Sequence, residues 1–302
     1  MNKITIENAC LKLKVLSYGG IIQSLFFKNK NGKFTNLVIN KKKLSDYKKD
    51  KWYLGSIIGR YAGRLSSSYQ INSVKYFINN DNGIQLHGSP NGWNSRIWSI
   101  KKNKGGNKVT LDYTCQNGSS GHPGEVKAKV TYKLLQNSLI INYKAISDKP
   151  TPVNITNHSY FNLSDGGEIK DHKLFVNSNK HLELDKKLLP TGKLLKVKNT
   201  KFDFSKLANI GNNYLDDCFV VNPKNKINAK LFSSKTGISM EVKTDQPGIV
   251  IFTPRSFNGI CFETQKFSNS PNIKSFPNTI LFPNEEYTHQ TTFTFKSINH
   301  SE

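Results

Sequence analysis

Short stretches in which apolar and polar residues alternate occur along almost the whole chain. Such period-two stretches, rich in Val, Ile, Thr, Tyr and Phe, predict β-strands with one buried face. We expect strands at residues 3–18, 32–40, 109–117, 125–134, 139–148, 248–253 and 291–298. No long segment places apolar residues at the 3.6-residue spacing of a helix, so helices should be short and few.

Turns containing glycine separate these stretches, for example at Tyr18-Gly19-Gly20, Gly105-Gly106 and Pro247-Gly248. Strands that follow one another without intervening helices predict an antiparallel sandwich or barrel. The chain has no internal repeat of 20–50 residues and no low-complexity linker. We therefore expect one all-β domain over residues 1–302.

The cysteines and the N-terminus indicate a soluble, cytoplasmic protein. The four cysteines are widely scattered, without a CxxC pair or metal-ligand spacing, so we expect free thiols and no structural metal. The N-terminal segment lacks the apolar core of a signal peptide, and no stretch approaches the length of a membrane span.

The formal charge of +23 invites a nucleic-acid interpretation, which the kind of basic residue opposes. Only Arg60, Arg64, Arg96 and Arg255 are arginines among 44 basic residues, whereas nucleic-acid surfaces favour arginine for its planar, bidentate fork. We expect a solvated, lysine-rich surface and no nucleic-acid partner. Because the composition is biased toward lysine, the remaining arginines should mark places that need a bidentate donor.

Two patches in the first third of the chain mix glycine, aromatic and polar residues. Residues 55–65 hold three glycines together with Arg60 and Arg64, and Arg60 could instead be paired with a carboxylate to fix a loop. Residues 85–98 place His87 before a glycine-containing loop with Trp93. Trp93 offers a flat face for a sugar, although a packed core residue is the commoner use.

Two later patches hold a histidine and a carboxylate. In residues 151–164, His158 would share a strand face with Thr156 and Tyr160, among hydrogen-bonding neighbours that fix its ring. In residues 259–265, Glu263 lies in an otherwise apolar strand, which is costly unless the carboxylate is paired or used. A histidine and a glutamate on separate strands favour general acid–base catalysis over a nucleophilic triad. No nucleotide-binding or metalloprotease motif is present.

Taken together, these patches resemble the aldose 1-epimerase (galactose mutarotase) family over nearly the whole chain. GRYAGR resembles the family's GRxANR element, LHGSPNGW its LHGGxxGW element, and TNHSYFNL its histidine motif. LDDCF matches a D-x-x-F element, and ETQ with the later FPNEEY matches the C-terminal signature. The motifs occur in the family's order.

The resemblance implies an antiparallel β-supersandwich and an isomerase that interconverts the anomers of a free aldose such as glucose or galactose. It implies that Glu263 is the general base and His158 the general acid, and that Arg64, His87 and Asp216 bind the sugar, with Asp217 as the rival of Asp216. It implies no cofactor and no metal. A small-molecule aldose is the expected partner, and we expect a monomer or a homodimer without membrane association.

Three departures from the family pattern bear on specificity. Gly63 stands where the family often has Asn, Val250 where some members have Gln, and Arg255 follows Thr253-Pro254 in place of a TGN sequence. They leave two alternatives open. One is a mutarotase for a sugar phosphate or uronic acid, with Arg255 near the mouth of the site. The other is a non-catalytic sugar-binding protein on the same scaffold. The remaining histidines are expected to be structural or on the surface, namely His122, His172, His181, His289 and His300.

Overall fold

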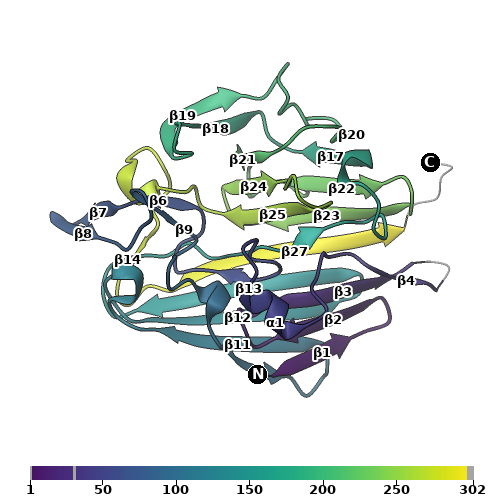
Figure 1. The fold of residues 1–302 in the computed structure, drawn as a ribbon, viewed down its shortest axis with the longest axis horizontal. Helices are drawn as coiled ribbons and strands as arrows, with labels where there is room; N and C mark the ends of the chain where they lie inside the picture. The colour runs from purple at the N-terminus through teal and green to yellow at the C-terminus, as the bar shows by residue number, and fades with distance from the viewer. Residues whose placement is uncertain (1, 30–31, 298–302) are drawn as a thin grey trace.

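The computed structural model describes residues 2–29 and 32–297, and their regular secondary structure is almost entirely β-strand (Figure 1). Within them lie one α-helix and four short 3₁₀ helices, namely α1 (Leu44–Lys48), η1 (Trp93–Ser95), η2 (Ser119–Gly121), η3 (Ile169–Asp171) and η4 (Ser270–Asn272). Each of the seven predicted stretches contains a strand, and the expectation of few, short helices is confirmed. Residue 298, the end of the last predicted strand, lies outside the described residues.

Three large sheets make up most of the fold. The nine-stranded sheet has the order β10 (Ser99–Lys102), β11 (Lys108–Cys115), β12 (Val126–Leu135), β13 (Ser138–Ser147), β27 (Tyr287–Ser297), β23 (Ile238–Thr244), β22 (Ala229–Ser233), β17 (His172–Val176), β20 (Ala208–Asn209). The six-stranded sheet has the order β16 (Tyr160–Phe161), β25 (Ile260–Gln265), β24 (Gly248–Phe252), β21 (Asp216–Val220), β18 (Lys180–Leu184), β19 (Pro190–Lys196). The four-stranded sheet consists of β1 (Lys3–Glu7), β2 (Leu11–Leu16), β3 (Ile22–Lys28), β4 (Phe34–Asn36).

Four two-stranded ribbons complete the strand pairing of the described residues. They are β5 (Ile57–Ile58) with β15 (Thr156–Asn157), β6 (Arg64–Ser66) with β9 (Ile84–Leu86), β7 (Ser68–Ile71) with β8 (Val74–Phe77), and β14 (Thr151–Pro152) with β26 (Ile280–Leu281). Every pairing between named strands is antiparallel, as the strand-and-turn pattern predicted.

The alternating sequence of each strand decides which of its faces is buried. In β12, Val126, Val130 and Tyr132 are fully buried, whereas Lys127 and Lys129 between them are exposed. Successive side chains of a strand point to opposite faces, so this alternation turns one whole face of the strand toward the core. Burying large apolar side chains stabilises the fold by roughly 1.5–3 kcal/mol each relative to leaving them exposed.

One hydrophobic core joins the three large sheets. It runs from Ile6 near the N-terminus to Phe295 near the C-terminus and includes inward-facing residues of all three sheets. The six-stranded sheet contributes Ile249, Ile251 and Phe262 to this core. The residues that alternate with them point to the sheet's opposite face, away from the nine-stranded sheet, and that face carries the candidate site.

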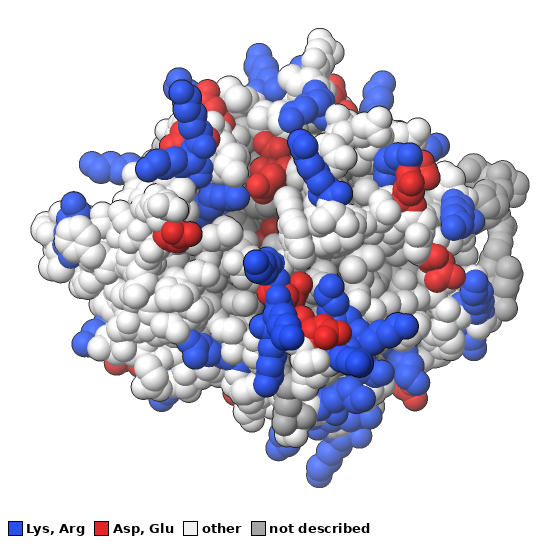
Figure 2. Space-filling view, in the orientation of Figure 1, with Lys and Arg blue, Asp and Glu red and all other residues white. Residues whose placement is uncertain are grey.

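Charge is distributed over the surface without a single basic stripe on the face shown in Figure 2, where lysine and arginine side chains are interspersed with acidic ones. Among the described residues, several lysines pair with carboxylates, such as Lys144 with Glu286 at 2.8 Å. No helix in the described part of the chain has the length and apolar character needed to cross a membrane.

Candidate active site

Strand register brings the polar residues of the six-stranded sheet together on one face. In β25, Ile260 and Phe262 enter the core, so Cys261, Glu263 and Gln265 face the other way, as their alternation predicted. Glu263 lies opposite Val250 of β24, and Phe252 of the same strand lies opposite both Cys261 and Asp216. The carboxylates of Glu263 and Asp216 therefore occupy adjacent rows of one sheet face.

His158 enters this face from the segment between β15 and β16. The predicted strand through residues 156–160 is interrupted at His158 and Ser159, but the backbone remains held on both sides. The His158 N–H donates to Ser56 O at 2.9 Å, and Gly55 N–H donates to His158 O at 3.0 Å. The Asn157 amide donates to Gly55 O at 2.9 Å. Backbone hydrogen bonds thus fix where the imidazole projects.

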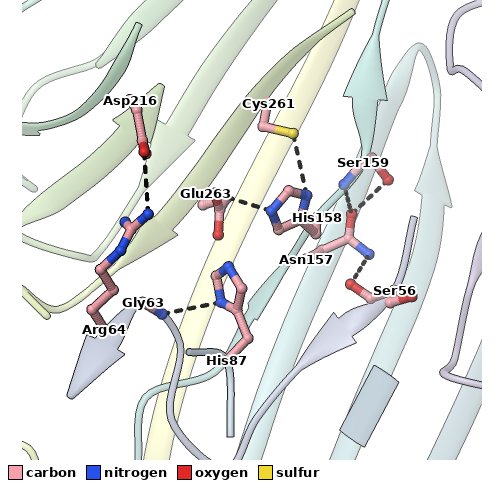
Figure 3. A network of polar contacts seen from close by, with 10 residues as sticks. All are labelled: Ser56, Gly63, Arg64, His87, Asn157, His158, Ser159, Asp216, Cys261 and Glu263. Atoms are coloured by element: carbon pink, nitrogen blue, oxygen red, sulfur yellow. Dashed lines mark hydrogen bonds and ion pairs between the residues drawn. The ribbon is translucent and has the colours of Figure 1, made fainter. Parts of the chain in front are cut away.

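His158 and Glu263 form a buried pair (Figure 3). His158 Nε2 lies 3.4 Å from Glu263 Oε1, and each side chain is only 4% exposed. On the other side of the ring, Cys261 Sγ lies 3.3 Å from Nδ1. Burial raises the pKa of the Cys261 thiol well above its ordinary value, so the thiol keeps its proton and can donate it to Nδ1. The contact between Sγ and Nδ1 fixes the ring so that Nε2 faces Glu263.

Arg64 and His87 come from the neighbouring ends of β6 and β9. Gly63 N–H donates to His87 Nδ1 at 3.2 Å, and His87 N–H donates to Gly63 O at 3.1 Å. The His87 ring centre lies 5.3 Å from that of His158. Arg64 Nη2 lies 3.4 Å from Asp216 Oδ2, and both groups are partly exposed. Figure 3 shows the side chains of Arg64, His87, His158, Asp216 and Glu263 arranged around one space.

Burial sets the charges of the site. Burial raises the pKa of Glu263 to about 8, with the nearby Asp216 carboxylate adding to this effect and Arg64 opposing it. Burial lowers the pKa of His158 to about 4. The pKa of His87 falls well below its usual value, because burial disfavours the charged ring and His158 and Arg64 lie nearby. His87 is therefore neutral at pH 7, and its Nε2–H is a hydrogen-bond donor.

Several polar atoms of the site have no partner among the described residues. Glu263 Oε2 and both side-chain polar atoms of Gln265 are buried without a hydrogen bond. Such groups are costly when left unmet, so they indicate a site that a polar ligand completes. They border a pocket with an enclosed volume of about 40 Å³, room for a few water molecules.

His87, His158 and Glu263 offer ligand atoms within 4.8 Å of one another, a spacing that also suits a metal ion. In metal sites, the second ring nitrogen of each histidine donates to an acceptor. Here Gly63 N–H donates to Nδ1 of His87, so the neutral ring carries its proton on Nε2, the nitrogen that faces the site. This arrangement favours hydrogen-bond donation to a sugar over coordination of a metal.

The structure separates the two aspartates that the sequence left as rivals. Asp216 lies on the site face with Arg64, whereas Asp217 is paired with His181, 3.7 Å from its Nδ1. Arg60 is buried and serves to fix loops, but its partners include the carbonyls of Pro123 and Gln116 and the Thr151 hydroxyl rather than a carboxylate.

The tryptophan and the other histidines that the sequence analysis considered contact protein groups outside the site, as far as they lie in the described residues. Trp93 is fully buried in the core and offers no face to a ligand. His122 contacts Tyr69 and Gln85, and His172 contacts Ser164 and the backbone of Leu163. His289 is bonded within the core. His300 lies outside the described residues.

Two neighbours of the site were missed by the sequence analysis. The Tyr53 ring packs 4.8 Å from His87 and 5.7 Å from His158, measured between ring centres, with its backbone in the left-handed region at φ +57°. Nothing in the sequence marks this conformation. Ser268 fills the space beside Gly63, because a Cβ added at Gly63 would lie 2.7 Å from Ser268 Cβ. Where the family often has an Asn side chain, this chain therefore has Gly63 with the hydroxyl-bearing Ser268 beside it, at the same edge of the pocket.

Comparison with known proteins gives a consistent result over the whole chain. The family model for aldose 1-epimerase matches residues 2–294. The galactose mutarotase of Sus scrofa is 31% identical, with 98% of this chain and 94% of that protein covered. The aldose 1-epimerase of Escherichia coli (strain K12) is 28% identical, with 96% and 93% covered. Among solved structures, a GalM/aldose epimerase homologue from C. elegans superposes with a TM-score of 0.93 at 28% identity, covering 99% of each chain.

Proposed function

The chain belongs to the aldose 1-epimerase family of carbohydrate isomerases, and from this premise we propose that it interconverts the α and β anomers of a free aldose such as glucose or galactose. The observation that carries the proposal is the buried contact of 3.4 Å between His158 Nε2 and Glu263 Oε1. Beside it, Glu263 Oε2 has no partner among the described residues and faces the pocket. A base and an acid are thus placed a few ångströms apart, the separation between the anomeric hydroxyl and the ring oxygen of one sugar.

In the reactive form of the pair, its one titratable proton lies on His158, so that an imidazolium faces the Glu263 carboxylate. In the proposed reaction, the Glu263 carboxylate takes the proton of the anomeric hydroxyl while His158 Nε2 gives its proton to the ring oxygen and becomes neutral. The C1–O5 bond breaks, and C1 becomes the carbonyl carbon of the open-chain aldehyde. Rotation about C1–C2 and reversal of both proton transfers close the ring as the other anomer. Glu263 gains one proton from the sugar and His158 gives one to it, so the pair holds one titratable proton before and after ring opening.

Arg64, His87 and Asp216 are proposed to bind the sugar. The neutral His87 ring donates its Nε2–H to the sugar near the ring oxygen, where charge changes during the reaction. Asp216, fixed by Arg64, accepts hydrogen bonds from hydroxyls on the side of the ring farther from C1. Gln265, on the same face as Glu263 and without a partner among the described residues, supplies a further donor and acceptor.

Polarimetry tests this proposal directly. Freshly dissolved α-D-glucose or α-D-galactose should reach anomeric equilibrium faster with the protein than without it, and Glu263→Gln should remove at least ~10²-fold of the catalysed rate. Glu263→Gln keeps the size and polarity of the side chain, and circular dichroism checks that the variant is folded. Full activity in Glu263→Gln would refute the assignment of the base. Binding of these sugars without acceleration by the wild type would favour a sugar-binding protein.

A further inference from the structure

Arg255 differs from the other three arginines in having no polar partner. Arg60 and Arg96 are hydrogen-bonded, and Arg64 is paired with Asp216. The guanidinium of Arg255 makes no hydrogen bond or ion pair with any residue that the structure describes, but its Cζ lies 4.5 Å from the centre of the Tyr214 ring. Stacking on an aromatic face holds the guanidinium plane while its N–H donors, at the edge, stay free for a ligand.

The Arg255 side chain borders a hollow of about 310 Å³, formed by residues 168–170, 211–214 and 253–258. Its walls carry amide and hydroxyl groups from Asn212, Asn213 and Ser256. Two other charged residues line it, Lys170 and Glu168, and they pair with each other at 2.5 Å. Because these two charges offset one another, the charge of Arg255 is the one that remains for a ligand, and an anionic group is its natural partner.

The hollow lies beyond the candidate active site in the direction of β21 and β24, and the two share no lining residue. Asp216 lies opposite Phe252, and the ladder extends one step further, because Thr253 N–H donates to Leu215 O at 2.9 Å. Tyr214 precedes Asp216 by two residues, just before β21 begins, and Leu215 between them is buried in the core, so we place the Tyr214 side chain on the face of Asp216, about 7 Å farther from Glu263. Its side chain is half exposed, at 51%. A sugar that places C1 at Glu263 and its far hydroxyls at Asp216 therefore points toward Tyr214 and Arg255.

We propose that Arg255, held on Tyr214, binds an anionic group, a phosphate or a carboxylate, carried by the aldose on the side away from its anomeric carbon. The inference rests on the proposed mutarotase function and narrows its substrate class. The planar guanidinium donates two parallel hydrogen bonds to two oxygens of the anion. The reaction at C1 is unchanged, since the anion takes no part in ring opening.

The test compares neutral and acidic sugars in the same assay. Anomer exchange is measured for glucose, glucose 6-phosphate and galacturonate, by polarimetry or exchange NMR, with the full chain and with Arg255→Ala, Arg255→Lys and Tyr214→Ala. The readout is the ratio of kcat/KM for each acidic sugar to kcat/KM for glucose. Lys224→Ala is the matched control, because it removes one positive charge from an exposed turn beyond the other end of β21.

We expect the ratio for at least one acidic sugar to fall about tenfold or more in Arg255→Ala, as loss of a charge-assisted hydrogen bond predicts. Arg255→Lys should lose less, Tyr214→Ala should lower the ratio by freeing the guanidinium, and Lys224→Ala should leave it unchanged. Acceleration of glucose but of neither acidic sugar would overturn the inference and leave the proposed function standing, and so would equal ratios in the wild type and Arg255→Ala. Acceleration of no sugar would refute the proposed function itself.

Discussion

Two buried histidines contact successive residues of strand β25 from opposite sides. His158 contacts Glu263 on the pocket side, and His289 contacts Thr264 on the core side, with its Nε2 3.1 Å from the threonine Oγ1. Burial lowers the pKa of both rings, to about 4 for His158 and about 3 for His289. Each also packs against a tyrosine ring. Burial, a lowered pKa and an aromatic neighbour therefore do not distinguish them.

The partners of the two rings do distinguish them. His289 Nδ1 donates to Ile155 O at 3.1 Å, and Nε2 lies 2.9 Å from the Thr291 hydroxyl, so both nitrogens are satisfied by neutral groups. His158 faces an ionisable carboxylate whose second oxygen has no partner among the described residues. A proton can move only where a second titratable group and room for a substrate exist. The difference supports the proposed catalytic role of His158 and a structural role of His289.

Substitution of each histidine by asparagine gives the largest expected contrast. His158→Asn should lower kcat by at least ~10²-fold, because the acid that protonates the ring oxygen is lost. His289→Asn should keep turnover in the folded enzyme but lower the free energy of unfolding by roughly 1–3 kcal/mol, since buried hydrogen-bonding groups lose their partner. Polarimetric rates and urea denaturation measure the two effects.

A control and a contrary outcome make this comparison decisive. His122→Asn, in a third buried position away from the pocket, should behave as His289→Asn does, because His122 contacts the neutral Tyr69 hydroxyl and Gln85 amide. If His289→Asn lost turnover while remaining folded and His158→Asn did not, the catalytic role would belong to His289 on the core side of β25 and not to His158.

The pH profile sharpens the same comparison, since only His158 has a titrating partner. The reaction needs one proton on the His158–Glu263 pair. Below about pH 4 the pair takes up a second proton and loses its base, and above about pH 8 it loses its only proton and its acid. We expect kcat/KM to be level between these limits and to fall about tenfold per pH unit outside them. The limits belong to the coupled pair rather than to either residue alone.

Rates for this profile are measured after subtraction of uncatalysed mutarotation, at pH values where circular dichroism shows a folded protein. His289→Asn should show the same limits as the wild type. A single limb near pH 6.5, the value of an ordinary exposed histidine, would contradict the assignment of a buried acid and base.

Much of the fold followed from sequence pattern, because strand alternation is a local property. The alternation in GICFETQ placed Glu263 on the face opposite Phe262, and the structure has this arrangement. The motif order also pointed to Asp216 rather than Asp217. The first inference needed only the period-two geometry of a strand, and the second came from the resemblance to the family's D-x-x-F element.

Contacts between segments that are distant in the chain could not be predicted from local sequence alternation. The left-handed backbone of Tyr53 brings its ring against two histidines from other parts of the chain, and no local sequence signal encodes that packing. The space beside Gly63 is filled by Ser268 from the far end of the chain. The carbonyl partners of Arg60 were equally invisible, since a sequence shows an arginine but not which backbone oxygens surround it.

The smallest effect expected is at Cys261, which contacts His158 Nδ1 and is in turn hydrogen-bonded to the Tyr160 hydroxyl. Cys261→Ala removes the hydrogen-bonding partner of His158 Nδ1, which fixes the ring and the place of its proton, so kcat should fall about 3- to 30-fold with little change in KM, on the scale of one buried hydrogen bond. Cys261→Ser, which retains a donor, should recover most of that loss.

Cys218→Ala is the control, because it removes a buried thiol that also lines the pocket but makes no hydrogen bond among the described residues. Equal losses in Cys261→Ala and Cys261→Ser would mean that Cys261 acts through packing and not by fixing the proton. Because the thiol acts only through His158, Cys261→Ala in a His158→Asn background should lower the rate no further.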